Sequence, residues 1–542
     1  MSPTHAPVGA PADSPTRAGR RQWLGLVVLA LPTLMVSLDV FVMLLALPQL
    51  SVRLHASSSQ QLWVMDVYGF MVAGFMMTMG TVGDRIGRRR LLLIAAAVFA
   101  VASVAAAYSP GPAVLIGSRA LLGIAGAALT PSTLSLITTM FRDPRQRATA
   151  IGVWAGAFTV GAIIGPILGG VMLERFWWGS VLLLGLPAMI LLLAIGPAVL
   201  PEYRDTAAGR LDLPSVALSL AAILPAVYGL KELAEGGWQP VPVLAILVGA
   251  GVAVVFIRRQ RRLTDPVLDL GLFAERSFAV TLGAMFGYTL LSGGVMVAVA
   301  QFFQLVAGLS PMEAGLALAP GMLAAVVSFQ VSPLLARRIH PAPLLAVGLT
   351  ISAIGLLAMT QTASDSSGIP VLVTGFALAS LGGGPLVTLG TNLVVGSAPP
   401  QRAGSAAAIA QTGNEFGYAL GVAAIGSLIT TVYHTRVRAT LPTAETTVDP
   451  AARDTLAGAV QTAADIPTRA ADILLAASRD AFTTGLHTAA AVAAALVAGL
   501  AGLLLTSLRD LPGPSGRPGE RADPGHETGE HPSSRPRPTP LT

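Results

Sequence analysis

Four ionisable residues lie inside long apolar stretches of the sequence, where a charge is costly: Asp39, Asp66, Glu415 and Arg119. Desolvation favours the neutral form of a carboxylic acid, so a buried acid can accept a proton near neutral pH and, once ionised, attract a cation. An arginine within a membrane span costs about 2.5–3.5 kcal/mol, so we expect Arg119 to face the interior and to find an acid or carbonyl groups. The set predicts proton and cation binding at shared acids. The alternatives are a structural ion pair of Asp39 or Asp66 with Arg119, and a structural or snorkelling Arg119.

Three further residues could contact a bound cation. Trp63 and Tyr68 stand close to Asp66 in the sequence and could stack on a flat cation, although a position at the membrane interface suits both equally well. Glu313 follows Ser310 and Pro311 at the expected start of a helix. An acid in a first turn interacts favourably with the helix dipole, and we favour that role for Glu313.

The composition places these residues in an integral membrane protein. Of 542 residues, 53% are hydrophobic and 11% are charged, and the mean hydropathy is +0.69. The net charge is +6, but the basic residues form short clusters between apolar runs, which argues against a nucleic-acid-binding surface. There are no cysteines, so disulfides and thiolate metal sites are excluded.

The apolar runs predict an all-α fold with fourteen membrane-spanning helices. A hydrocarbon core of about 30 Å needs about 20 apolar residues per helix. With both chain ends in the cytoplasm, the short outer loops hold only Arg53, Arg175 and Lys231, so positive charge is retained inside. The helices are expected near residues 23–48, 61–81, 91–108, 113–139, 148–173, 178–200, 213–233, 240–257, 278–304, 312–335, 342–361, 369–395, 405–431 and 484–508.

The spans divide the chain into two six-helix bundles separated by two inserted helices. A helix start is also expected at Asp449 and Pro450 in the outer segment. The tails are too rich in Pro, Gly, Ser and charge to bury a core, so we expect them to be disordered. The predicted parts are a cytoplasmic tail 1–20, a first bundle 21–200, inserted helices 201–257, a second bundle 258–508 with an outer loop 433–483, and a cytoplasmic tail 509–542.

An internal repeat supports the two bundles. The loop residues Pro144, Gln146, Arg147 and Ala148 recur as Pro399, Gln401, Arg402 and Ala403, and glycines at every fourth position follow in both copies (Gly161, Gly165 and Gly169; Gly413, Gly417 and Gly421). Duplicated bundles of this kind bind substrate near the membrane midplane and expose it alternately to each side.

Two motifs point to a family. The inner loop Gly80, Gly83, Asp84, Arg85, Gly87, Arg88, Arg89, Arg90 resembles the signature loop of the major facilitator superfamily, and its acid could act as a conformational latch rather than as part of a positive-inside anchor. The fifth helix carries Gly161, Gly165, Pro166, Gly169 and Gly170, which resembles the antiporter motif of that superfamily rather than ordinary small-residue packing.

Other segments narrow the resemblance. Arg119 with Gly123 and Gly126 is similar to the superfamily's embedded arginine motif, with Leu122 where the family has a polar residue. The stretches around Asp39, Asp66 and Ser310 resemble the fourteen-helix drug:proton antiporters that export methyl viologen and quaternary ammonium compounds. The resemblance implies a monomeric plasma-membrane exporter of small lipophilic cations, driven by the proton motive force and without another cofactor.

Several other functions compete with proton-coupled drug efflux. A dedicated exporter of a self-made antibiotic would share every motif. An intramembrane aspartyl protease would need a Gly-x-Gly-Asp pattern, whereas Asp39 follows Leu38. An ATP-driven pump would need a phosphate-binding loop, yet the only lysine is Lys231, which is expected outside. Metal catalysis would need a close pair of histidines on one helix.

Overall fold

The computed structural model describes residues 18–202, 204, 212–236, 239–263, 270–397, 403–440 and 453–508, and the regular structure in these ranges is helical. A helix forms in each of the fourteen segments predicted to span the membrane. Within the described ranges, 12 helices are long and apolar enough to cross a membrane, or 13 if the bent pair Ser59–Met76 and Thr78–Ile86 is one span. Leu213–Gly229 is a shorter apolar helix. The predicted all-α membrane fold is therefore confirmed.

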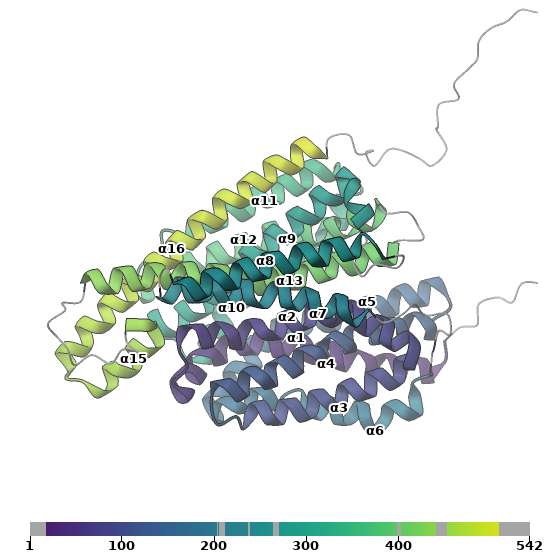
Figure 1. Ribbon diagram of the computed structural model, residues 1–542, viewed down its shortest axis with the longest axis horizontal. Helices are drawn as coiled ribbons and strands as arrows, with labels where there is room; N and C mark the ends of the chain where they lie inside the picture. The colour runs from purple at the N-terminus through teal and green to yellow at the C-terminus, as the bar shows by residue number, and fades with distance from the viewer. Residues whose placement is uncertain are drawn as a thin grey trace, which may run out of the picture.

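The helices form two groups, visible as the lower and upper parts of Figure 1. The first half contains α1 Arg20–Leu54, α2 Ser58–Ile86, α3 Arg88–Ala107, α4 Pro112–Met140, α5 Pro144–Arg175 and α6 Leu186–Val199. The second half contains α9 Arg276–Gln301, α10 Pro311–Leu335, α11 Pro341–Met359, α12 Ile369–Gly396, α13 Ala403–Thr440 and α16 Thr468–Ser507. Between them in sequence are α7 Leu213–Gly236 and α8 Pro240–Gln260, and α15 Leu456–Asp465 precedes α16.

The predicted outer segment 433–483 is largely helical where the structure describes it. The helix α13 continues to Thr440, and α16 begins at Thr468. A hydropathy profile detects only the apolar part of a helix. Polar helical turns can extend the helix beyond the membrane when they pack against other helices, and the profile does not detect them. Leu474 of α16 packs with Ala459 of α15 in such a cluster. The expected helix start at Asp449 and Pro450 lies outside the described residues, as do the tails 1–17 and 509–542 and the repeat residues Pro399, Gln401 and Arg402.

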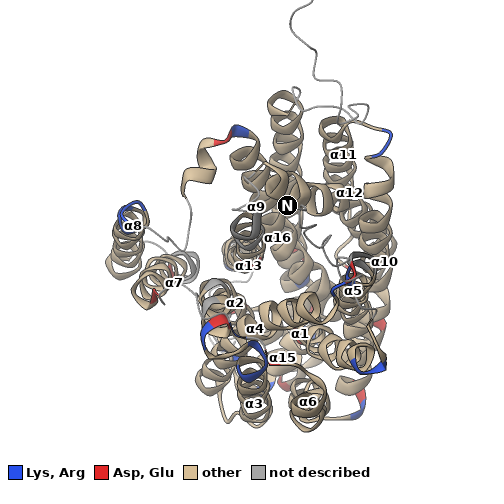
Figure 2. Cartoon of the chain, turned by 90° about the vertical axis from the view of Figure 1, so that its right-hand side faces the viewer, with Lys and Arg blue, Asp and Glu red and all other residues tan. Residues whose placement is uncertain are grey.

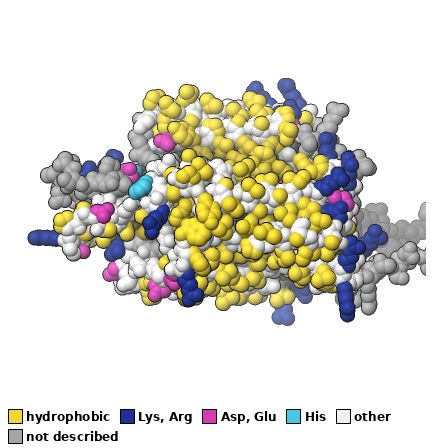
Figure 3. Space-filling view, turned by 90° about the horizontal axis from the view of Figure 1, so that it is seen from below, with side chains coloured by type: hydrophobic (Ala, Val, Ile, Leu, Met, Phe, Trp, Pro, Cys, Tyr) yellow, Lys and Arg dark blue, Asp and Glu magenta, His cyan; other side chains and the backbone are white. Residues whose placement is uncertain are grey.

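Charge marks the two ends of the helical bundle. The space-filling view shows an apolar band across the middle of one face, with basic side chains beyond one edge and mixed charges beyond the other (Figure 3). We call the side that carries Arg88, Arg259 and Arg337 the arginine-rich side, and the side that carries α15 the α15 side. Such a belt is what a protein surrounded by hydrocarbon presents.

The two halves use their glycine rows in the same way. A Cβ atom built at Gly161 of α5 would lie 2.6 Å from the Leu34 carbonyl oxygen of α1. In the second half, a Cβ atom at Gly417 of α13 would lie 2.9 Å from the Phe286 carbonyl oxygen of α9. Glycine thus lets the fifth helix of each half approach the first, as the internal repeat predicts.

Two seams join the halves, and both are tight toward the α15 side. At one seam, a Cβ atom at Gly170 of α5 would lie 2.5 Å from Met312 Cα of α10. At the other, a Cβ atom at Gly426 of α13 would lie 2.6 Å from Leu62 Cδ2 of α2. Toward the arginine-rich side the ribbons of the two halves diverge (Figure 1), and a Cβ atom at Gly152 of α5 would meet no heavy atom within 4 Å. The arrangement is closed on the α15 side.

The inserted helices cover one seam. Figure 2 shows α7 beside α2 and α13, with α8 on its outer flank. Phe70 of α2, Val227 of α7 and Ala419 of α13 form a buried cluster that spans all three helices. At the arginine-rich end, Arg259 of α8 donates to Asp212, which precedes α7, at 2.8 Å. The pair α7–α8 is therefore a hairpin fastened along the α2–α13 seam.

A pair of glycines on α8 tests how the hairpin is held. A Cβ atom at Gly249 would lie 2.5 Å from the Ala222 carbonyl oxygen of α7, whereas one at Gly251 would meet nothing within 4 Å. We expect Gly249→Leu to overpack the contact and to destabilise the protein by about 1–3 kcal/mol. Gly251→Leu should leave the melting temperature in detergent unchanged. Equal melting temperatures for the two variants would show that α7 and α8 are not held by this contact.

Candidate functional site

A buried ion pair joins α1 to α4. Arg119 Nη1 lies 2.5 Å from Asp39 Oδ2, and the side chains are 2% and 9% exposed. Arg119 Nε donates to the Val64 carbonyl oxygen of α2 at 3.2 Å. The arginine thus faces the interior and finds both an acid and a carbonyl group. In this conformation Asp39 forms the ion pair with Arg119 that the sequence analysis gave as an alternative.

The ring of Tyr68 completes the surroundings of the guanidinium group. Arg119 Cζ lies 4.7 Å from the centre of the Tyr68 ring, a distance typical of a cation–π contact. Two glycines of α4 make room for this residue, because a Cβ atom would lie 2.5 Å from the Tyr68 carbonyl oxygen if built at Gly123 and 2.9 Å from its hydroxyl oxygen if built at Gly126. Tyr68 is therefore interior, rather than at the membrane interface, and it faces the protein's own cation.

Asp66 lies on the side of α2 that meets the second half. It is 1% exposed. Leu62 and Gly69, four residues before and three residues after it, both abut α13, the first at Gly426 and the second at Ala419. Since residues three and four apart share a helix face, Asp66 faces α13 across the seam. Trp63, one residue after Leu62, is half-buried.

Glu415 approaches the same seam from the other half. Its Oε1 accepts a hydrogen bond from Gln411 Nε2 at 3.0 Å, and a Cβ atom at Gly69 would lie 3.9 Å from its carbonyl oxygen. The neighbouring Asn414 accepts a hydrogen bond on its Oδ1 from Thr289 Oγ1 at 3.3 Å, which links this turn of α13 to α9. Tyr418, three residues after Glu415 on α13, is half-buried, and a Cβ atom at Gly293 of α9 would lie 2.9 Å from its ring. Asp66 and Glu415 therefore lie on the two helices that meet at the α2–α13 seam, whereas Asp39 and Arg119 pair inside the first half.

Glu313 lies elsewhere, at the α15-side end of α10. Its carboxylate accepts from the Ser310 backbone N–H at 2.9 Å, and Ser310 Oγ accepts from the Glu313 backbone N–H at 3.2 Å. This reciprocal pair is a capping box. The structure thus places Glu313 in the first turn of α10.

The antiporter motif of α5 contacts two different helices, α1 and α10. Gly161 and Gly169 lie against α1, where a Cβ atom at Gly169 would lie 2.9 Å from Val42 Cγ1. Gly170 and Pro166 lie against α10, where a Cβ atom built at Gly315 would lie 2.5 Å from the Pro166 carbonyl oxygen. Gly165, between them, is also buried. One motif therefore holds α5 inside its own half and closes the seam to the other half.

The latch loop is organised by acids on the arginine-rich side. Asp84 Oδ1 accepts from Arg88, with Nη2 at 2.6 Å. Arg89 Nε lies 3.4 Å from Glu202 Oε2, and its guanidinium group also donates to the Leu200 carbonyl oxygen at 3.0 Å, at the end of α6. Between the arginines and α2, Gly87 has φ = +108°. Arg85 is half-buried.

Glu202 was missed by the sequence reasoning. It follows α6, and counting basic residues for orientation gives no weight to the acids of the same side. The signal that could have found it is an acid directly after a helix whose end lies on the side of the Arg88–Arg90 cluster. In the present conformation, the contacts of Asp84 with Arg88 and of Arg89 with Glu202 and Leu200 join the latch loop to α3 and to the end of α6, inside the first half.

Comparison with known proteins identifies the family. Residues 29–422 match the family described as Major Facilitator Superfamily. The chain belongs to the major facilitator superfamily. It is 38% identical to the multidrug efflux pump LfrA of Mycolicibacterium smegmatis over 92% of this chain and 98% of that protein. It is 34% identical to the methyl viologen resistance protein SmvA of Salmonella typhimurium over 85% of this chain and 93% of that protein.

A solved structure supports the fold of this superfamily member. A bacterial homologue of the human lysosomal transporter Spinster, in an inward-facing and unoccupied conformation, matches with a TM-score of 0.62 at 18% identity, over 90% of this chain and 98% of the other. The family and its relatives indicate a membrane transporter rather than an enzyme.

The buried pair of this transporter predicts an asymmetric response to charge removal. Asp39→Asn leaves Arg119 charged without its carboxylate, and breaking a buried pair in this way costs about 3–5 kcal/mol. Asp39→Asn combined with Arg119→Met removes both charges, so we expect it to be more stable than Asp39→Asn alone. Melting temperatures of the purified single and double variants measure this. Additive effects of the two single substitutions would contradict the pairing.

The latch loop offers a matched pair of glycines. At Gly87 a Cβ atom would collide with the Glu202 carboxylate, and the positive φ disfavours any side chain, whereas a Cβ atom at Gly80 meets nothing within 4 Å. We expect Gly87→Ala to cost about 1–3 kcal/mol through backbone strain. Gly80→Ala should be tolerated. Thermal unfolding in detergent distinguishes them, and an unperturbed Gly87→Ala protein would argue that the turn does not need its glycine.

Proposed function

We propose that this transporter exports lipophilic cationic drugs in exchange for protons. The observation that carries the proposal is the placement of Asp66 and Glu415 on α2 and α13, helices that pack on one another across the seam between the two halves. A carboxylate at a seam that opens and closes can bind a cation in one state and a proton in the other. The relatives named for multidrug efflux and methyl viologen resistance support cations of this class.

The orientation follows from the arginines. Arg88, Arg259 and Arg337 mark one side, and positively charged loops are retained in the cytoplasm. We therefore place the arginine-rich side and both chain ends in the cytoplasm and the α15 side outside the plasma membrane. The described conformation, tight at the α15 side, is then the one that receives drug from the cytoplasm or the inner leaflet.

The cycle alternates between two states of the seams. A cation that reaches Asp66 and Glu415 from the cytoplasmic side displaces their protons, and the halves then rock to open the outer side. Protons from outside neutralise the acids, which releases the cation, because a neutral acid no longer attracts it. Asp39 is already balanced by Arg119 at 2.5 Å, so Asp66 and Glu415 are the acids that exchange ligands. The proton motive force supplies the energy.

Inverted membrane vesicles test the proposal with ethidium or methyl viologen. We expect Asp66→Asn and Glu415→Gln to lower proton-driven transport by about tenfold or more, in the range of a lost coupling energy. Glu313→Gln is the matched control, because this carboxylate lies in a capping box, and it should transport like the wild type.

Two results would count against the proposal. If Asp66→Asn and Glu415→Gln both transport like the Glu313→Gln control, the seam acids do not couple protons to drug. If the wild type moves no cation under a verified pH gradient, cation export is wrong and a dedicated exporter of one antibiotic becomes the better reading. Collapse of the pH gradient on adding drug provides an independent measure of exchange.

A further inference from the structure

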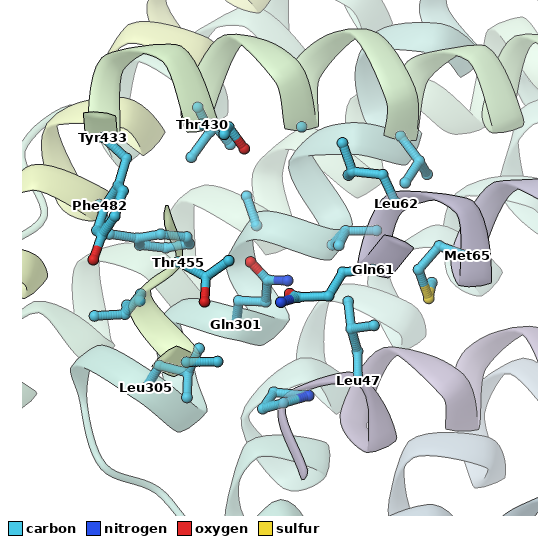
Figure 4. Close-up of a pocket in the computed structure, with 18 of the residues that line it drawn as sticks. Leu47, Gln61, Leu62, Met65, Gln301, Leu305, Thr430, Tyr433, Thr455 and Phe482 are labelled. Atoms are coloured by element: carbon cyan, nitrogen blue, oxygen red, sulfur yellow. The ribbon is translucent and has the colours of Figure 1, made fainter. Parts of the chain in front are cut away.

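A cavity of about 70 Å³ lies between the two halves on the α15 side (Figure 4). The first half contributes Leu47 of α1 and Gln61 of α2, and the second half contributes Gln301 of α9 and Thr430 of α13. Because its walls come from both halves, the cavity must change shape when the halves move relative to one another.

The size of this cavity suits water and excludes a drug. A buried water needs about 10–15 Å³ of such space, whereas a site for a drug-sized ligand has about 300–1,000 Å³. Its walls supply polar partners: Gln61 and Gln301 point toward one another from opposite halves (Figure 4). Thr430 and Thr455 add hydroxyl groups. A cavity with several donors and acceptors holds water, unlike an apolar void of the same volume.

The inner end of the cavity lies next to a candidate proton-binding acid. Leu62 and Met65 of α2 line the cavity, and Asp66 follows Met65 directly. Asp66 and Leu62 are four residues apart on one helix face, a rise of about 6 Å. The carboxylate is thus one turn from the cavity. The charged and titratable side chains around Asp66 are Tyr68 of α2, Asp39 of α1, Arg119 of α4, and Glu415 and Tyr418 of α13, whereas α7 faces this region with apolar Val227.

The outer end of the cavity is covered by α15. Leu456, the first residue of α15, is 4% exposed and belongs to the main core. The helix is fixed by Thr455, whose Oγ1 accepts from the Gly458 backbone N–H at 2.9 Å, and Phe482 of α16 lies beside it at the cavity wall. The cover presents Asp454 and Thr455 beside the apolar Leu456 and Ala457.

We propose that this cavity is a water-filled vestibule through which protons reach Asp66 from the α15 side, separate from the path of the drug. The inference rests on the proposed proton-coupled transport and adds to it the route by which the proton reaches its acid. Leu62 and Met65 separate the vestibule from the carboxylate in the described conformation. A small displacement of α2 against α13 joins the two, before the seam is wide enough for a drug.

The test replaces the two amide side chains that would bind the water by leucine, which is of similar size and cannot form hydrogen bonds. Gln61→Leu and Gln301→Leu, singly and together, are reconstituted in liposomes with ethidium or methyl viologen as the drug. Two rates are measured for each variant: uptake driven by a pH gradient, and exchange of labelled for unlabelled drug at equal pH on both sides. Gln361→Leu, at an exposed position after α11, is the matched control.

We expect the double leucine variant to lose about tenfold or more in gradient-driven transport while drug exchange stays within about twofold, because only the proton step needs the vestibule. Gln61→Asn with Gln301→Asn keeps both amides and should retain gradient-driven transport, which also covers the case that the leucine variant does not fold. Loss of transport in the asparagine variant would overturn the proposal.

Two further outcomes are decisive. Full gradient-driven transport in the leucine variants would overturn the vestibule while leaving proton-coupled export intact. A parallel loss of gradient-driven transport and drug exchange, in a variant that elutes as a folded protein, would mean that the cavity lies on the drug path. If the wild type itself shows exchange without any response to the gradient, the proposed function fails and not the vestibule alone.

Discussion

The buried ion pair between Asp39 and Arg119 is the constraint on which the interior of the first half depends. An arginine at this depth is tolerated only with a partner, and its three neighbours are an acid of α1, a carbonyl group of α2 and the face of Tyr68. One side chain thus fixes three helices relative to one another. Because that charge is neutralised inside its own half, the proposed exchange of proton and drug is assigned to Asp66 and Glu415 at the seam.

The seams between the halves obey a different rule. Their closest contacts are made by glycine, alanine and backbone, which allow the helices to approach closely. At the α5–α10 seam, Glu174 Oε1 also accepts a hydrogen bond from the Met312 backbone N–H at 3.3 Å. Gly170 against Met312 and Gly69 against Ala419 illustrate this at the two seams. Ionic contacts such as Asp84 with Arg88 stay within one half. Rigid halves with weakly held seams are what rocking motion requires.

The sequence predicted the parts that hydrophobicity and charge dictate. Fourteen helices, the arginine-rich side and the inward-facing Arg119 follow from the cost of polar groups in hydrocarbon. The extensions of α13 and α16 could not be predicted, because hydropathy is silent once a helix leaves the membrane. The contact of Glu202 with Arg89 and the partner choice of Asp39 depend on distances between segments far apart in the chain. The packing of the Asp66 face of α2 against α13, the helix of Glu415, likewise depends on the three-dimensional structure.

The hairpin of α7 and α8 makes the two flanks of the transporter unequal. On the flank of α2 and α13, α7 covers the seam, and Phe70 beneath it is buried. On the flank of α5 and α10, the surrounding lipid borders the helices of the seam directly. The two flanks of the protein therefore present different surfaces to the bilayer, one made by the α7–α8 hairpin and the other by the helices of the seam.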